Sequence, residues 1–184
     1  FDLLSREFAH TRRKNLLLRD LDELVNQQLA KMLFANPQRI DYYDRYQEII
    51  DAYNAEQNRA TIEKTFMDLM ELASSLDTEQ QRYVREGFSS DEELSVYDLL
   101  FSENLTKQEI ETIKKVSVDL LTKIKQQIAK LDHWTDKQET KAIVDNLIRN
   151  TLWQELPNSY DVSDIQTYQK KIYEYVYMRY PEVA

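Results

Sequence analysis

Residues 106–131 read TKQEIETIKKVSVDLLTKIKQQIAKL, and this stretch decides the fold. Glu109 follows Thr106 at the spacing of a capping box, in which hydroxyl and carboxylate each accept a hydrogen bond from a backbone amide at a helix start. Apolar residues then recur every three or four positions, which predicts one amphipathic helix over 107–131. Its apolar side consists of Ile110, Ile113, Val116, Leu120, Ile124, Ile128 and Leu131.

The same capping pattern recurs three times in the second half of the chain. The pairs are Ser90 with Glu93, Thr135 with Gln138, and Ser163 with Gln166. Each opens an apolar-periodic run, so the pattern predicts further helices over about 91–101, 136–153 and 164–179. Pro181 closes the last of these helices.

The first half of the chain also has helical periodicity. A helix is predicted over 3–19, and Asp20 is a candidate cap for a second helix that starts at Leu21 and stops at Asn36-Pro37. A third helix is predicted over about 39–53. A fourth carries Ile62 to Leu76 and is interrupted at Asp77-Thr78, and a polar helix over 79–86 then ends at Gly87.

Gly87 is the only glycine in 184 residues. Phosphate-cradling loops and dinucleotide-binding turns need several glycines, so neither can be built from this chain. Many-stranded proteins also need more turn residues than it has. We therefore predict an all-α, irregular bundle of about seven to eight helices without a sheet. A left-handed Gly87 would divide it into segments 1–87 and 88–184.

Composition limits the class of protein further. The chain has no cysteine and a formal net charge of −9, and it lacks the run of about 20 apolar residues that a membrane-spanning helix requires. Residues 61–105 carry 11 acidic and three basic side chains, whereas residues 106–131 carry six basic and three acidic. This unevenness fits either contacts within an assembly or solvated helix faces. A first residue of Phe1 in place of Met favours a piece of a longer protein.

No catalytic or metal-binding pattern stands out. The two histidines, His10 and His133, lack neighbours at ligand spacing, so neither a metal nor a catalytic residue is predicted. The acidic pairs Glu92-Glu93 and Asp132/Asp136 lie at predicted helix starts, where negative charge is stabilised by the helix dipole.

Aromatic residues are concentrated near the end of the chain, which has 12 tyrosines in all. Five of these tyrosines, at positions 168, 173, 175, 177 and 180, lie in the last predicted helix or at its end. Side chains so spaced cannot all face the core from one helix, so some are predicted to face a partner chain. The alternatives are a helix buried between its neighbours or a platform for stacked bases. The candidate interface residues are Trp134, Trp153, Tyr168, Tyr173, Tyr175, Tyr177 and Tyr180.

Basic residues offer a second candidate surface. A row of lysines on the 107–131 helix and a basic cluster near the start could follow a phosphate backbone, although such residues are often simply solvated. The candidates for DNA or phosphate contact are Arg12, Arg13, Lys14, Lys115, Lys123 and Lys130.

Two segments resemble a known family. Residues 88–100, FSSDEELSVYDLL, resemble the S-x-E-E-L-x-x-Y/F-D-x-L segment near the C-terminus of the R subunits of type I restriction enzymes. Residues 131–142, LDHWTDKQETKA, resemble the D-W-x-x-K-x-x-x-[RK]-A pattern of that family, apart from His133 between Asp132 and Trp134. The resemblance covers residues 88–184, and residues 1–87 would be the helical segment that continues from the motor region.

The resemblance implies an ATP-driven restriction system of the bacterial cytoplasm. Its R subunit carries a nuclease and a DNA-translocating motor that use ATP and Mg²⁺, and it docks on a core of modification and specificity subunits. No catalytic signature lies in this chain, so we expect a non-catalytic docking domain that has no cofactor of its own, meets DNA through the parent complex and binds no membrane. The alternatives are a DNA-guiding element of the motor and a regulatory nucleotide site.

Overall fold

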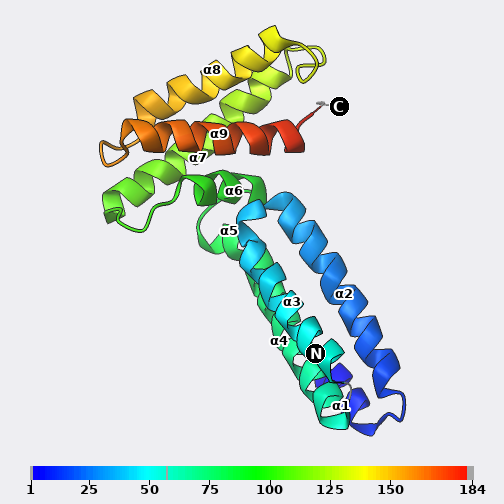
Figure 1. Cartoon of the computed structure of the whole chain (residues 1–184). Coiled ribbons are helices and arrows are strands. Elements are labelled where there is room, and N and C mark those ends of the chain that lie inside the picture. Colours follow the sequence, from blue (N-terminus) through cyan, green and yellow to red (C-terminus); the bar gives the residue numbers. More distant parts are fainter. Residues whose placement is uncertain (1, 57, 182–184) are drawn as a thin grey trace. The chain divides into compact units, whose positions relative to one another are not determined.

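The computed structural model describes residues 2–56 and 58–181, and within these ranges it contains helices and no strand (Figure 1). The predicted all-α class is therefore confirmed. Eight of the nine α-helices described have at least seven residues. Their bounds are α1 Asp2–His10, α2 Lys14–Ala35, α3 Ile40–Ala55, α4 Arg59–Gln80, α5 Arg82–Arg85, α6 Asp91–Leu100, α7 Lys107–Ile128, α8 Gln138–Glu155 and α9 Val162–Arg179.

The chain divides into two compact units at Gly87. The N-terminal unit comprises residues 1–87 and the C-terminal unit residues 88–184. None of the helices described is both long and apolar enough to cross a membrane.

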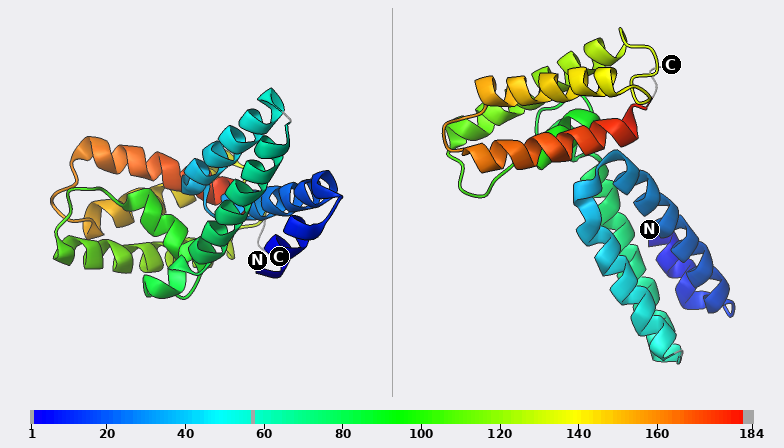
Figure 2. Two further views of the ribbon diagram at one scale, coloured as in Figure 1. Left: turned by 90° about the horizontal axis from the view of Figure 1, so that it is seen from below. Right: turned by 45° about the horizontal axis from the view of Figure 1, so that its top comes forward.

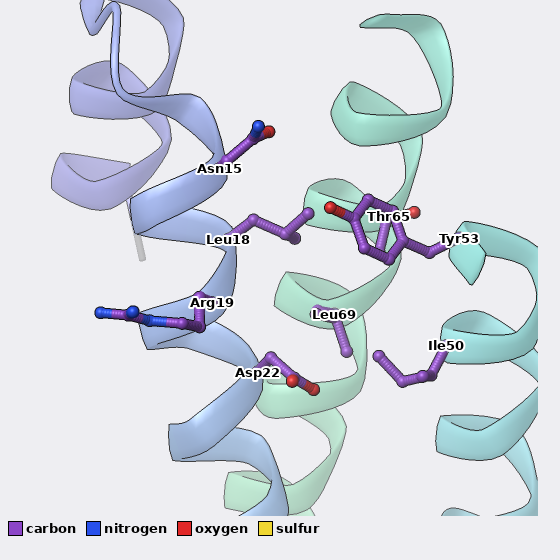
Figure 3. Close-up of a pocket in the computed structure, with 8 residues that line it drawn as sticks. All are labelled: Asn15, Leu18, Arg19, Asp22, Ile50, Tyr53, Thr65 and Leu69. Atoms are coloured by element: carbon purple, nitrogen blue, oxygen red, sulfur yellow. The ribbon is translucent and has the colours of Figure 1, made fainter. Parts of the chain in front are cut away.

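In the N-terminal unit, α2 and α3 each pack along α4. The core consists mainly of leucines and aromatic residues on the facing sides of these helices, and α1 adds Phe8, whose ring stacks on that of Phe66 with 3.7 Å between centroids. A short 3₁₀ helix, Pro37–Arg39, joins α2 to α3, and the Asn36 side chain caps it by accepting a bond from the Gln38 amide. A small cleft remains between α2 and α3, with α4 as its floor (Figure 3).

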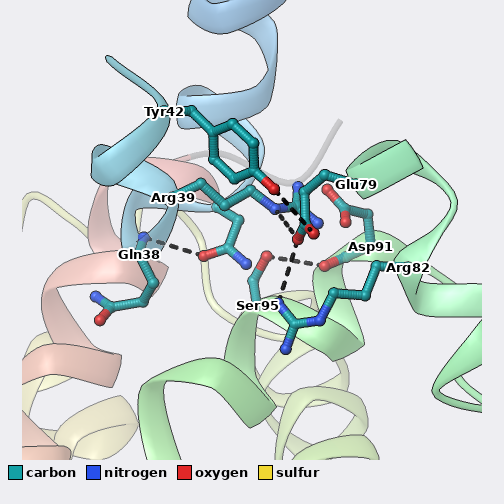
Figure 4. Close-up of polar contacts among 8 residues, drawn as sticks. Gln38, Arg39, Tyr42, Glu79, Arg82, Asp91 and Ser95 are labelled. Carbon is teal, nitrogen blue, oxygen red and sulfur yellow. Dashed lines mark hydrogen bonds and ion pairs between the residues drawn. The ribbon is translucent and has the colours of Figure 1, made fainter. Parts of the chain in front are cut away.

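A buried ion pair ties the 3₁₀ helix to the end of α4. The guanidinium of Arg39 lies 3.0 Å from a carboxylate oxygen of Glu79, and both side chains are almost wholly buried (Figure 4). Arg82 contacts the same carboxylate at 3.2 Å, and the Tyr42 hydroxyl donates to it at 3.5 Å. Because Glu79 has three partners, its charge is compensated inside the fold.

The C-terminal unit is built on α7. This helix packs between α6 and α8, and α9 packs against both α8 and α6 (Figure 2). The predicted apolar side of α7 forms much of the core, since Ile113, Leu120 and Ile124 are fully buried. Tyr160, in the loop before α9, closes one end by donating a 2.7 Å hydrogen bond to the carbonyl oxygen of Leu100.

Two described residues have positive φ angles, and each lies at a turn. Gly87, just after α5, has φ +85°, which is the left-handed conformation that we predicted for it. Its amide donates a hydrogen bond to the carbonyl oxygen of Val84. The second is His133 with φ +44°. This residue lies between Asp132 and Trp134, in the turn that precedes α8.

Two of the four predicted capping pairs are wrong. Helix α8 begins at Gln138 after Lys137, with no side-chain cap, and Thr135 lies in the preceding turn. Helix α9 begins two residues before the predicted start, because Asp161 and Asp164 form the capping box that we assigned to Ser163 and Gln166.

The other two capping pairs are present. Thr106 and Glu109 form a complete box, and hydrogen bonds from Thr106 lower the pKa of the Glu109 carboxyl. Ser90 accepts from the Glu93 amide, whereas the Glu93 carboxylate accepts from the amide of Ser89. The predicted helix starts at 91 and 107 are therefore confirmed.

Several predicted helix ends in the first half are also wrong. Helix α1 stops at His10, because a turn follows in which the Arg13 amide donates to the Thr11 hydroxyl at 3.1 Å. Asp20 consequently lies inside α2 and caps nothing. Helix α4 continues through Asp77-Thr78, since the Thr78 hydroxyl is satisfied by the carbonyl oxygen of Ser74. The predicted helix over 79–86 is reduced to the four residues of α5.

Candidate docking surface on the C-terminal helices

Trp134 is a buried residue that supports two tyrosines of α9. It is 1% exposed, and its ring makes edge contacts with Tyr173 and Tyr177, with centroids 6.2 and 5.7 Å apart. Its indole N–H donates a 2.6 Å hydrogen bond to the carbonyl oxygen of Tyr180. The indole is thus fully satisfied inside the unit and holds the two tyrosine rings in place.

Above this indole, α8 and α9 form a shallow groove, which we call the aromatic groove. Its volume is about 480 Å³, and it is lined by Gln138, Lys141, Tyr173, Glu174, Tyr177 and Met178. Met178 is 64% exposed and Tyr177 is 38% exposed. The Lys141 ammonium lies 5.7 Å from the centre of the Tyr177 ring, a cation–π distance. The groove therefore combines apolar surface, hydroxyl groups, one positive charge and one negative charge.

The other predicted interface aromatics lie outside the groove. Tyr175 is 3% exposed and belongs to the core, so neither it nor Trp134 offers surface to a partner. Tyr168 is half-buried against Tyr160, and Trp153 is half exposed near the far end of α8. Trp153 is 12 residues beyond Lys141, about 18 Å along the helix. The structure thus groups Tyr173, Tyr177 and the supporting Trp134, and leaves Trp153 apart.

An ion network that the sequence did not reveal fixes the end of α9. Glu92 on α6 binds Lys125 on α7 and lies 3.6 Å from Arg179 on α9. Burial alone would raise the pKa of Glu92, but Lys125 and Arg179 hold that pKa below its ordinary value. Lys125 also lies 5.3 Å from the centre of the Tyr180 ring, and burial raises the pKa of the Tyr180 hydroxyl.

The adjacent residues Glu92 and Glu93 have different structural roles. Glu93 accepts a bond from a backbone amide at the start of α6, while Glu92 joins three helices. The only signal in the sequence was the acidic pair itself, because the partners of Glu92 lie more than 30 residues away.

Two of the six predicted DNA contacts are engaged within the fold. Lys14 lies 2.6 Å from Glu63, and Lys123 lies between Asp119 at 2.5 Å and Glu155 at 2.6 Å. Hydrogen bonds with Asp119 and Glu155 raise the pKa of Lys123. The other four candidates, Arg12, Arg13, Lys115 and Lys130, are exposed. Arg12 and Arg13 belong to the N-terminal unit, whereas Lys115, Lys123 and Lys130 belong to the C-terminal unit.

No metal-binding group was found in the described part of the chain, where no three histidine or acidic side chains are arranged to hold an ion.

Comparison with known proteins gives one family. No curated protein and no solved structure matches the chain. A family model described as "Type I restriction enzyme HindI endonuclease subunit-like, C-terminal" matches residues 2–180. The match spans both units and so extends beyond residues 88–184, on which the sequence resemblance rests. The chain therefore belongs to the family of C-terminal domains of HindI-like endonuclease subunits of type I restriction enzymes.

Proposed function

We propose that this domain is a non-catalytic docking part of the endonuclease subunit, which anchors the subunit to a methyltransferase core of modification and specificity subunits. The observation that carries the proposal is the aromatic groove, where Tyr177 and Met178 are exposed above the buried Trp134. In this proposal, the nuclease and the ATP- and Mg²⁺-dependent motor lie elsewhere in the parent subunit, and DNA is reached through the whole complex.

The side chains of the groove suit a protein partner. Tyrosine and methionine are enriched in protein interfaces, because they offer large apolar area, and tyrosine adds a polar edge. Tyr173 and Tyr177 are held by ring contacts with each other and with Trp134, so little side-chain freedom is lost when a partner binds. Met178 contributes apolar surface that the fold itself leaves exposed.

The groove also has a mixed charge that can fix the orientation of a partner. Lys141, on α8, lies over the Tyr177 ring, and Glu174, on α9, also lines the groove. Charged groups at the rim of an apolar contact contribute mainly to specificity and association rate. A docking site of this kind needs no reactive group, in line with the structural roles found for Trp134, Glu92 and Glu93.

The test is assembly of the parent subunit with its core. Met178→Glu and Tyr177→Ala should each weaken assembly about tenfold or more, because they change the centre of a small apolar contact. Val162→Glu is the matched control, since Val162 is 54% exposed on the same helix but lies outside the groove. Association constants can be measured by sedimentation or biolayer interferometry, with thermal unfolding to confirm the fold.

A deletion gives the second arm of this test. Removing residues 88–184 from the parent subunit should abolish assembly. Normal assembly after this deletion, or wild-type affinity in both groove variants, would refute the proposed function.

A further inference from the structure

The cleft in the N-terminal unit is a second candidate contact site. It encloses about 260 Å³ and is lined by residues of three helices, namely Asn15, Leu18, Arg19, Asp22, Ile50, Tyr53, Thr65 and Leu69. Leu18, Ile50 and Leu69 give it an apolar floor. Tyr53 reaches across from α3 toward Leu18 on α2, so that its ring forms one wall (Figure 3).

One end of the cleft is closed by hydrogen bonds. The Tyr46 hydroxyl donates to a carboxylate oxygen of Asp22 at 2.8 Å and accepts from the side-chain amide of Asn26 at 3.1 Å. Burial, with a contribution from this bond to Asp22, raises the pKa of Tyr46 to about 12, so the hydroxyl keeps its proton near neutral pH. The bridge spans α2 and α3, and an occupant therefore cannot lie along the whole length of the two helices. The space suits a single long side chain.

The lining has one carboxylate, Asp22, together with the Asn15 amide and the hydroxyls of Tyr53 and Thr65, which can both donate and accept. A carboxylate has about four acceptor positions, and Tyr46 uses one of those on Asp22. Asp22 makes no ion pair with any residue in the described ranges. Thr65, which is 3% exposed, has no hydrogen-bonding partner for its hydroxyl among those residues either. The one cationic side chain of the lining, Arg19, is directed away from the cleft in Figure 3 and contacts Asp20 and Glu23.

We propose that this cleft receives an arginine side chain of the partner complex. The guanidinium would bind the Asp22 carboxylate and stack on the Tyr53 ring, while its methylene stem would lie on Leu18 and Leu69. Charge complementarity supports a basic occupant, because residues 1–87 carry 16 acidic and 12 basic side chains. The inference rests on the proposed docking function and adds a second point of contact to it.

The cleft can be tested without the partner. The chain is titrated with N-acetyl-arginine amide and, separately, with the citrulline analogue, which has nearly the same shape but no charge, and binding is followed by NMR chemical shifts. The arginine compound should shift residues around Asp22, Tyr53 and Leu69 with millimolar affinity, and the citrulline analogue should bind at least tenfold more weakly. Equal shifts with both compounds, or none with either, would overturn the proposal.

Charge-matched variants sharpen this test. Asp22→Asn still offers an oxygen to Tyr46 but removes the charge, so it should abolish arginine binding while thermal unfolding stays close to that of the wild type. Asp44→Asn is the control, since Asp44 is an exposed carboxylate on α3 outside the cleft. Equal weakening by both variants would mean that general charge, and not this site, attracts the guanidinium.

The origin of the arginine is tested in the parent complex. There, Asp22→Asn should weaken assembly with the core about tenfold, and Asp44→Asn should not. Arginine binding by the isolated chain together with unchanged assembly of the Asp22→Asn subunit would show that the cleft serves a free small cation, and would reject a partner side chain. Loss of assembly in Met178→Glu tests the aromatic groove independently, so the two proposals can fail separately.

Discussion

The indole N–H of Trp134 lies 2.6 Å from the carbonyl oxygen of Tyr180, to which it donates a hydrogen bond. This bond joins the turn before α8 to the end of α9, 46 residues later. It satisfies a carbonyl group in the last turn region of α9 and holds the indole beneath Tyr173 and Tyr177. The groove that we propose as a docking surface thus depends on a residue that no partner can touch.

Replacing this indole should loosen the C-terminal unit. Trp134→Phe removes the hydrogen bond and leaves a gap, and we expect a loss of about 2 kcal/mol in the free energy of unfolding. Urea unfolding followed by circular dichroism measures the loss. The control is Trp153→Phe, which alters a half-exposed ring and should change the stability by less than about 0.5 kcal/mol. Equal effects of the two changes would contradict the anchoring role.

The Glu92 network should make stability depend on pH in a defined window. The pKa of Glu92 is lowered in the fold, so its contribution is present above the unfolded-state value of about 4.3 and is lost as the pH falls through the lower folded-state value. Glu92→Gln should therefore cost about 1 kcal/mol at pH 7 and progressively less below pH 4. Urea unfolding of wild type and variant across this range measures the difference. A cost that does not change with pH would exclude the ionic origin.

At Gly87 there is space for a methyl group, but the backbone angle φ is unfavourable for a residue that has a Cβ atom. A Cβ at this position would meet no atom within 4 Å, yet φ is +85°. Gly87→Ala should consequently cost about 1 kcal/mol, and Gly87→Asn should cost less, because asparagine adopts left-handed backbone more readily. Chemical denaturation of the three proteins should give this order, and an alanine variant as stable as the wild type would contradict it.

The capping residues provide a direct comparison between two similar sequence patterns. Thr106→Ala should cost about 1 kcal/mol, because Thr106 caps α7 and completes a box with Glu109. Thr135→Ala should have a much smaller effect, since Thr135 caps no helix and makes one long bond of 3.4 Å to the carbonyl oxygen of Pro181. Thermal unfolding distinguishes the two variants, and a larger loss for Thr135→Ala would reverse our assignment.

The basic candidates also separate into two groups. If the isolated chain binds duplex DNA at low salt, Arg12→Gln with Arg13→Gln should reduce that binding, because both side chains are exposed in the turn between α1 and α2. Lys123→Gln should leave it unchanged, because Lys123 is held by Asp119 and Glu155. Fluorescence anisotropy with a labelled duplex measures both effects. A stronger loss for Lys123→Gln would contradict this division and support DNA contact along the lysine row of α7.

Helix type and period could be predicted from local sequence, whereas several helix starts could not. Thr106 with Glu109 is followed at once by an apolar stripe, and the helix begins there. Ser163 with Gln166 has the same spacing, but Asp161 stands two residues earlier and caps the helix first. Thr135 does not cap α8 because of a tertiary contact. Trp134 is buried and bonded to the carbonyl oxygen of Tyr180, which holds the residues around Thr135 in a turn.

The sequence predicted which aromatic residues belong to the candidate site, but not which of them lie together on the surface. Tyr173 and Tyr177 are about 40° apart around the helix and Tyr175 is nearly opposite, so local geometry alone separates them. Which side faces the core depends on α6 and on Trp134, and both are distant in sequence. The ion pairs Arg39–Glu79 and Glu92–Lys125 escaped prediction for the same reason, because 40 and 33 residues separate their members.

The buried side chains of the N-terminal core cluster all come from residues 8–76, ahead of Gly87. A substitution that changes the volume of one of these side chains can therefore be compensated by a second substitution within the same stretch of chain, so this cluster can be repacked as a local unit.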